Sequence, residues 1–344
     1  MPISQTDTTL DFVTYAADNY SHWVAYWLES ASRSNPDSRL FVYDISAQPS
    51  PNLQRLVGQY HNAQLIPWPQ SAWKSPSWIE KTNFQFFWQN FSLRDEIKYL
   101  SRRLRYRLTC QRKHDWMIDK RAFVADKQLF IHMSCQKPHI LHDAWRRSDR
   151  PLAFVDADAV VLAHIPSYPG GESDIAVTVE EPDRVRIGQD GDGPDGPIPI
   201  ILINAGVIFI NRTSVAPHFL DTWVNEMERV HHGSGDQTAL ANLLYRHDHD
   251  FHKTLRPISV GTDEGTALVA CLPCARYNQV RIPRDSKAIR AEAAIAHFVG
   301  SWKQKEHWDC VEAIIRESWL QRNFPGKIQA SLTAPGIEST RTPL

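Results

Sequence analysis

A chain of 344 residues with 42% hydrophobic and 22% charged residues can bury a substantial core, and its composition is that of a globular protein. The net charge of −1 provides no overall field to attract nucleic acid or a membrane surface, so we expect no nucleic-acid partner. No apolar run approaches the roughly 18 residues of a membrane span, so we expect none.

Two features of the sequence bear on its compartment. The first residues, MPISQTDTTLDF, lack the basic and apolar regions of a signal peptide. The five cysteines are irregularly spaced, which is typical of a reducing compartment rather than of a disulfide framework. Cys271 and Cys274 form a lone CxxC without a second pair, and we interpret them as small buried side chains. We therefore expect a cytoplasmic protein.

The N-terminal part of the chain alternates between apolar strands and helices. Residues 12–16 form a short apolar run that predicts a strand. A helix follows, because four side chains recur at helical spacing: Trp23, Tyr26, Trp27 and Ala31. We predict further strands at 39–45 and 63–68 and a helix at 52–60. A strand, a helix and a strand in succession form a βαβ unit, whose strands are parallel.

The same alternation continues through the rest of the chain. Helices are predicted at 137–150, 216–230 and 233–246. Apolar strands are predicted at 151–162, 174–180 and, as a pair or one bent strand, 200–213. This order of elements predicts an α/β fold with a central, mostly parallel sheet flanked by helices.

Two segments between these elements have unusual compositions. Residues 97–121 carry nine Lys or Arg against two Asp, which indicates either a solvated helix face or a peripheral contact with an anionic acceptor or membrane surface. Residues 182–199 are rich in Pro, Gly and Asp. Pro194 stands where a calcium loop needs a carboxylate, so we expect a mobile loop here, a candidate lid, rather than a calcium site.

The string FVDADAVVL, residues 154–162, places two carboxylates at the end of an apolar strand. Positions i and i+2 of a strand point to one face, so Asp156 and Asp158 would form a small anionic clamp. Unpaired charge is costly to bury, and a divalent cation would neutralise both groups. Ligands bind at the carboxyl ends of parallel strands in open α/β sheets. We therefore predict a metal site, with a pair of solvated aspartates in a turn as the alternative.

A second string, AIAHFVGSWK, residues 294–303, supplies the groups that such a site needs. His297 follows a small apolar strand and fits a third metal ligand, which favours Mn²⁺ over Mg²⁺. Gly300 would let the backbone approach a phosphate, and Lys303 would place a positive charge on it. The alternative is a core histidine beside a surface lysine.

Five stretches of the sequence resemble, in the same order along the chain, the motifs of the glycogenin and lipopolysaccharide-galactosyltransferase type of retaining glycosyltransferase, which has the GT-A fold. They are FVTYAADNYS, FVDADAVVL, NAGVIFINRT, GDQTALAN and HFVGSWK, and together they span residues 12–303. The resemblance implies a single GT-A domain over 1–325. A nucleotide-binding half would cover about 10–165, an acceptor and sugar half about 166–325, and a flexible tail 326–344.

The resemblance also implies a role for each matching residue. Asp156, Asp158 and His297 would hold Mn²⁺ or Mg²⁺, and Gly300 and Lys303 would contact the donor diphosphate. The nucleoside would lie against Tyr15, Asp18 and Tyr20. The donor sugar would be lined by Lys137, Asn204, Asp236 and Gln237, of which the last three, with Lys303, are the expected catalytic residues.

The function that the resemblance implies is a metal-dependent hexosyltransferase. It would move a sugar from a nucleotide donor, such as a UDP-sugar, to a hydroxyl of a glycan, a protein or a lipid-linked saccharide, with retention. Inverting transfer with Asp236 as the base stays open. So does a non-catalytic protein that binds nucleotide sugars. A nucleotidyltransferase would need a glycine-rich loop with a cation after its first strand, and TYAADNYS has neither.

Overall fold

The computed structural model describes residues 9–82, 113–182, 186–193, 196–232, 235–280, 289 and 292–298. Several sequence predictions lie outside these residues: the cationic segment as far as residue 112, Gly300, Lys303 and the tail 326–344. In the part of the chain that the structure describes, no helix is long and apolar enough to cross a membrane.

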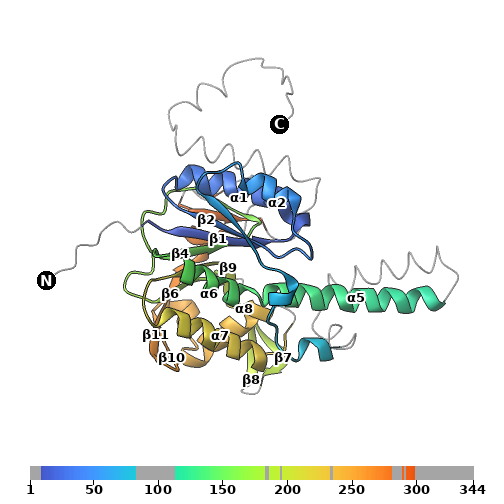
Figure 1. The fold of residues 1–344 in the computed structure, drawn as a ribbon. Helices are drawn as coiled ribbons and strands as arrows, with labels where there is room; N and C mark the ends of the chain where they lie inside the picture. Colours follow the sequence, from blue (N-terminus) through green and yellow to red (C-terminus); the bar gives the residue numbers. More distant parts are fainter. Residues whose placement is uncertain are drawn as a thin grey trace, which may run out of the picture.

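One eight-stranded sheet forms the centre of the protein (Figure 1). Its strands lie in the order β10 (Ile258–Thr262), β11 (Gly265–Pro273), β6 (Ile175–Val179), β9 (Ile203–Ile210), β4 (Leu152–Val155), β1 (Asp11–Ala16), β2 (Leu40–Asp44) and β3 (Ala63–Pro67). The β11·β6, β4·β1, β1·β2 and β2·β3 pairs are parallel, whereas β10 and β9 run against their neighbours. The prediction of an α/β fold with a mostly parallel central sheet is therefore confirmed.

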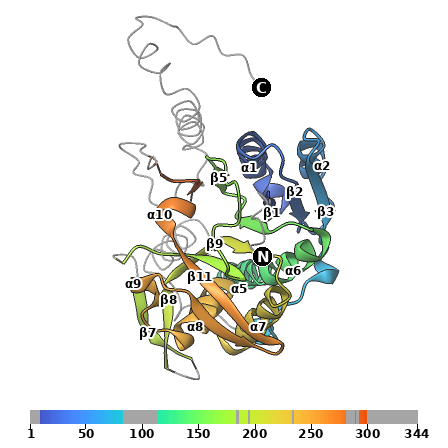
Figure 2. The ribbon, with the colours of Figure 1, turned by 90° about the vertical axis from the view of Figure 1, so that its left-hand side faces the viewer.

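The parallel half of the sheet is built from the predicted βαβ units. Helix α1 (Ser21–Ser34) links β1 to β2, and α2 (Pro51–Val57) links β2 to β3. Ser50 caps α2 by accepting a hydrogen bond from the backbone N–H of Leu53 at 3.0 Å, and Pro51 takes the first helical position, where its missing N–H costs nothing. Both helices lie on one face of the sheet (Figures 1 and 2).

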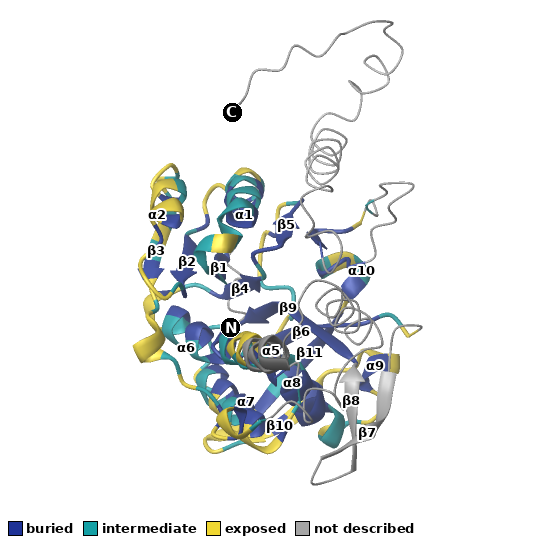
Figure 3. Cartoon of the chain, turned by 90° about the vertical axis from the view of Figure 1, so that its right-hand side faces the viewer, coloured by how far each residue is buried: buried dark blue, intermediate teal, exposed yellow. Residues whose placement is uncertain are grey.

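Alternate residues of the strands face two separate cores. Phe12 and Val155 pack with Trp27 of α1 on one face, whereas Val13 and Phe154 pack on the other. The second core includes helices α6 (Lys137–Arg147), α7 (Ala216–Arg229) and α8 (Gly235–His247). Because both faces are covered, the inner strands β4, β6 and β9 are buried throughout and β1 nearly so, as Figure 3 shows.

Several elements lie outside the two helix layers. Helix α5 (Lys113–Ser134) projects from the body of the molecule (Figure 1), and the short helix α9 (Phe251–Thr254) precedes β10. Three single 3-10 turns cover Asp18–Tyr20, Gln70–Ala72 and Ile79–Lys81. The short helix α10 (Cys274–Tyr277) follows β11, and the side chains of Cys271 and Cys274 are buried, as predicted.

A small second sheet positions a predicted metal ligand. Strand β5 (Ala159–Val161) pairs antiparallel with β12 (Ile295–His297), and His297 lies opposite Ala159. The backbone N–H of Phe298 also donates to the carbonyl of Asp158 at 2.9 Å. Because of this pairing, His297 reaches Asp158 although the two residues are far apart in the sequence.

The prediction of a loop over residues 182–199 is wrong. Strands β7 (Arg186–Gly193) and β8 (Gly196–Ile201) pair antiparallel, with register shifts after Arg186 and Ile187. The high content of Gly, Pro and Asp in this segment had favoured a loop over paired strands. Proline is tolerated in such an isolated pair because its two strands are both edges.

Candidate active site

The site lies at one edge of the central sheet, where the parallel strands end. Strands β1, β2 and β4 end at Ala16, Asp44 and Val155, and the antiparallel β9 begins at the same edge. Open α/β sheets bind ligands at this edge because the connecting loops leave a crevice there. The strand ends and the first turns of two helices therefore bring chain segments that are distant in sequence to one place.

The two aspartates of FVDADAVVL do not lie within one strand, as the sequence had suggested. Strand β4 ends at Val155, and the backbone N–H of Ala159 donates to the carbonyl of Asp156 at 2.9 Å. A tight turn therefore separates β4 from β5, which belongs to a different sheet. The turn, not the strand pleat, aims Asp156 and Asp158 at the same point.

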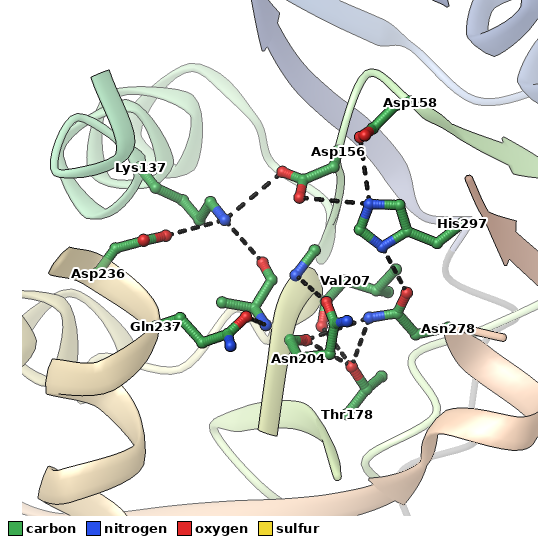
Figure 4. Close-up of polar contacts among 12 residues, drawn as sticks. Lys137, Asp156, Asp158, Thr178, Asn204, Val207, Asp236, Gln237, Asn278 and His297 are labelled. Carbon is green, nitrogen blue, oxygen red and sulfur yellow. Dashed lines mark hydrogen bonds and ion pairs between the residues drawn. The ribbon is translucent and has the colours of Figure 1, made fainter. Parts of the chain in front are cut away.

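His297 completes a three-residue cluster with these aspartates (Figure 4). Its Nε2 lies 3.1 Å from Oδ1 of Asp158 and 3.7 Å from Oδ2 of Asp156. One ligand atom from each of the three residues falls within 4.8 Å of the others. Asp158 and His297 are buried, whereas Asp156 is partly exposed to the pocket.

The histidine ring lies directly over Gly206. A Cβ atom at Gly206 would stand 2.3 Å from Cε1 and 2.6 Å from Nδ1 of His297. No real Cβ contact is that short, so any other residue at this position would displace the ring. The glycine of the NAGV sequence is therefore required by close approach.

Lys137, the first residue of α6, forms the second charged centre of the site. Its Nζ lies 2.9 Å from Oδ2 of Asp236, 3.5 Å from Oδ1 of Asp156 and 2.9 Å from the carbonyl oxygen of Ala205, to which it donates. It also lies 4.9 Å from the ring centre of Phe154. The lysine therefore connects the metal-ligand cluster to the first turn of α8.

In the ion pair of Lys137 and Asp236, burial and the neighbouring charges shift the pKa of each group in opposite directions. Burial lowers the pKa of Lys137, but the carboxylates of Asp156 and Asp236 more than offset it, so that its pKa is raised. Burial raises the pKa of Asp236, and Lys137 works in the opposite direction. Burial also raises the pKa of Tyr15. The lysine therefore stays charged, and the Tyr15 phenol stays neutral.

Asn204 and Gln237 are held by backbone groups at the start of β9. The backbone N–H of Gly206 donates to Oδ1 of Asn204 at 2.9 Å, and Nδ2 of Asn204 lies 3.3 Å from Oε1 of Glu180. The backbone N–H of Ala205 donates to Oε1 of Gln237 at 3.2 Å. In both side chains the carbonyl oxygen is engaged, which orients the amide NH₂ groups.

These residues line one pocket of 290 Å³. Its lining includes the predicted residues Tyr15, Tyr20, Lys137, Asn204, Asp156, Asp158, Asp236, Gln237 and His297. Phe130, Met133 and Ser134 of α5 complete one wall, and nothing in the sequence pattern had indicated them. Asp18 is outside this lining, because its carboxylate accepts hydrogen bonds from Ser50 and Asn52.

The donor set fits a divalent cation. Two carboxylates and one imidazole are hard or borderline ligands of the kind that bind Mn²⁺. An imidazole nitrogen 3.1 and 3.7 Å from two carboxylate oxygens needs either a proton or a cation between them. The three residues that the sequence singled out are thus brought together in an arrangement that suits a metal ion.

No protein-family profile and no curated protein matches the chain. Among solved structures, the chain is similar to the apo structure of the bifunctional glycosyltransferase WbbM, with a TM-score of 0.50 and 14% identity over 93% of this chain. It spans about half of that protein, 52% of its length. A structure of the galactosyltransferase LgtC with donor and acceptor sugar analogues matches with a TM-score of 0.43 and 13% identity, over 90% of this chain and 96% of that one.

The likeness to WbbM establishes the fold and not the activity, because the identity is only 14%. The chain has the α/β fold of GT-A glycosyltransferases, as the sequence predicted. What the protein does has to be argued from its site.

Proposed function

We propose that this protein is a metal-dependent glycosyltransferase that moves a sugar from a nucleotide donor, UDP-linked, to an acceptor hydroxyl with retention. One observation carries the proposal. The cluster of Asp156, Asp158 and His297 shares a single pocket with the Lys137–Asp236 ion pair, at the ligand-binding edge of a GT-A fold. The fold alone would not support an activity.

The pocket offers a different chemistry to each part of such a donor. Tyr15 and Tyr20 form a partly aromatic wall with Ala16, Ala17 and Ile45, which suits a nucleobase. Asp156, Asp158 and His297 would hold the cation, which would neutralise the charge that develops on the departing diphosphate. Lys303, outside the described residues, would add a second positive charge there.

The opposite wall would hold the sugar. The NH₂ groups of Asn204 and Gln237 would donate to its hydroxyls, and Asp236 would steady positive charge on the ring. Inversion would require Asp236 to act as a base while it is ion-paired with Lys137 at 2.9 Å. The ion pair therefore favours retention. The anomeric configuration of the product, determined by NMR, distinguishes retention from inversion.

A thermal-unfolding series tests the proposal. We expect UDP and UDP-sugars to raise the Tm by several degrees with Mn²⁺ and far less without it, because a ligand that binds only the folded state stabilises it by mass action. Nucleoside triphosphates serve as the comparison. A larger shift with triphosphates would indicate a nucleotidyltransferase. A UDP-sugar that binds with Mn²⁺ but is neither hydrolysed nor transferred would indicate a non-catalytic protein.

A further inference from the structure

Asn278 is a fully buried residue that no motif of the sequence indicated, and it contacts a predicted metal ligand. Its Oδ1 lies 3.0 Å from Nδ1 of His297. It directly follows α10, and the next residue, Gln279, is hydrogen-bonded to both Ile295 and His297 of β12. The backbone therefore fixes the Asn278 amide beside the imidazole.

The hydrogen bonds of the Asn278 amide determine which of its atoms faces the histidine. Its Nδ2 lies 3.2 Å from the carbonyl oxygen of Asn204, which can only accept. It also lies 2.9 Å from Oγ1 of Thr178, whose own hydrogen is directed to that same carbonyl at 2.7 Å. The group that faces Asn204 and Thr178 must therefore be the NH₂, and the group that faces His297 must be the carbonyl (Figure 4).

This orientation determines the tautomer of His297. A carbonyl oxygen accepts and does not donate, so Nδ1 must carry a proton. With a cation bound, Nε2 then presents its lone pair to the space shared with Asp156 and Asp158; without one, Nε2–H can donate to Asp158. Histidine ligands of metals are commonly oriented by a hydrogen bond to the other ring nitrogen, which fixes the tautomer and the ring plane.

We infer that Asn278 is a positioning residue that holds His297 as the Nδ1–H tautomer, with Thr178 and the Asn204 carbonyl fixing the amide. The metal part of this inference rests on the proposed function, whereas the tautomer does not. The backbone carbonyl that Asn278 and Thr178 both contact belongs to Asn204, whose residue lines the pocket. One hydrogen-bond network therefore aligns the metal ligand with the strand that would hold the donor sugar.

Two variants separate the positioning role from a structural one. Asn278→Leu removes the acceptor at similar volume. Asn278→Asp keeps an acceptor facing Nδ1, and the Thr178 hydroxyl can turn to donate to its other oxygen. Both changes should lower stability, because the site is buried. Only Asn278→Leu should release the ring. Asn242→Leu is the matched control, since Asn242 is a buried asparagine bonded to Glu226 at 2.6 Å, away from the pocket.

The first readout is the proton on Nδ1 of His297, from long-range ¹H–¹⁵N correlation spectra of the metal-free, histidine-labelled full chain. The signals of His297 are those missing in His297→Gln. We expect Nδ1–H in the wild type, in Asn278→Asp and in Asn242→Leu, and its loss in Asn278→Leu. A wild-type ring without a proton on Nδ1, or an unchanged Nδ1–H in Asn278→Leu, would overturn the inference whatever the protein's activity.

The second readout is Mn²⁺ affinity, from calorimetric titration with and without UDP. Loss of a hydrogen bond to a metal ligand lowers affinity by about 10–100-fold, so we expect that weakening in Asn278→Leu and near-wild-type binding in Asn278→Asp and Asn242→Leu. Equal affinity in Asn278→Leu and the wild type would overturn the positioning role alone. A wild type that binds no Mn²⁺ but keeps the Nδ1–H tautomer would overturn the metal site of the proposed function.

Discussion

Changing Asp158 to asparagine should lower Mn²⁺-dependent donor turnover by about two to three orders of magnitude, the scale of losing one group that stabilises developing charge. The variant keeps the side-chain shape, and the hydrogen bond from Phe298 to residue 158 is made by the backbone carbonyl. The fold should therefore survive. Turnover is measured as release of UDP from UDP-sugars across a Mn²⁺ titration.

Asp174→Asn is the matched control for this change. Asp174 is also a buried aspartate, and its Oδ2 accepts from the backbone N–H of Leu268 at 2.7 Å, away from the pocket. Asp174→Asn should cost stability without altering the Mn²⁺ dependence. If Asp158→Asn turned over like the wild type, or like Asp174→Asn, the assignment of Asp158 as a metal ligand would be wrong.

Lys137 should also contribute strongly to the stability of the fold. Changing Lys137 to methionine should destabilise the metal-free protein by about 3–5 kcal/mol, because it leaves buried Asp236 and neighbouring Asp156 without their cation. Adding Asp236→Asn should recover much of that loss, since the uncompensated charge is removed with it. The measurement is urea unfolding of both variants in the presence of a chelator. Both variants should lack turnover.

Lys253→Met is the control, because it removes the lysine of an ion pair that is exposed on the surface. Lys253 pairs with Asp250 at 2.6 Å, but their side chains are 65% and 62% exposed, so its removal should cost at most about 1 kcal/mol. A Lys137→Met variant as stable as Lys253→Met would show that the buried pair does not hold the site together. A double variant less stable than Lys137→Met would contradict the charge argument.

The elements that set the sheet were predictable because each has its own local signal. Apolar runs gave the strands β1, β2 and β6, and the spacing of Trp23, Trp27 and Ala31 gave α1. The order of motifs also indicated which residues would meet, because strand ends of a parallel sheet lie at one edge. Asp156 and Asp158 were placed at this edge in that way, whereas His297, on β12 of the second sheet, was assigned as a metal ligand from its own motif.

The contacts within the site could not be predicted in the same way. Asn278 reaches His297 only because residue 279 is hydrogen-bonded to β12, and no sequence pattern reports that pairing. The turn after β4 was hidden by the apolar residues on both sides of Asp156 and Asp158, which read as one strand. The hairpin β7–β8 was missed because a composition rich in glycine and proline is shared by loops and tight turns.

The expected contact of Asp18 with the nucleoside stays a prediction. The position of this residue in FVTYAADNYS implied a contact with the nucleoside, but its carboxylate binds Ser50 and Asn52 beyond the pocket lining. The assignment of Tyr15 and Tyr20 fits the pocket, because both lie in its wall.

Anomalous diffraction from crystals grown with Mn²⁺ and UDP would locate the metal ion and the nucleotide together. We expect one strong manganese peak bounded by Asp156, Asp158 and His297, with the diphosphate beside it and the nucleobase against Tyr15 and Tyr20. A manganese peak elsewhere, or UDP bound in this pocket with no manganese between the three residues, would contradict the proposed metal site.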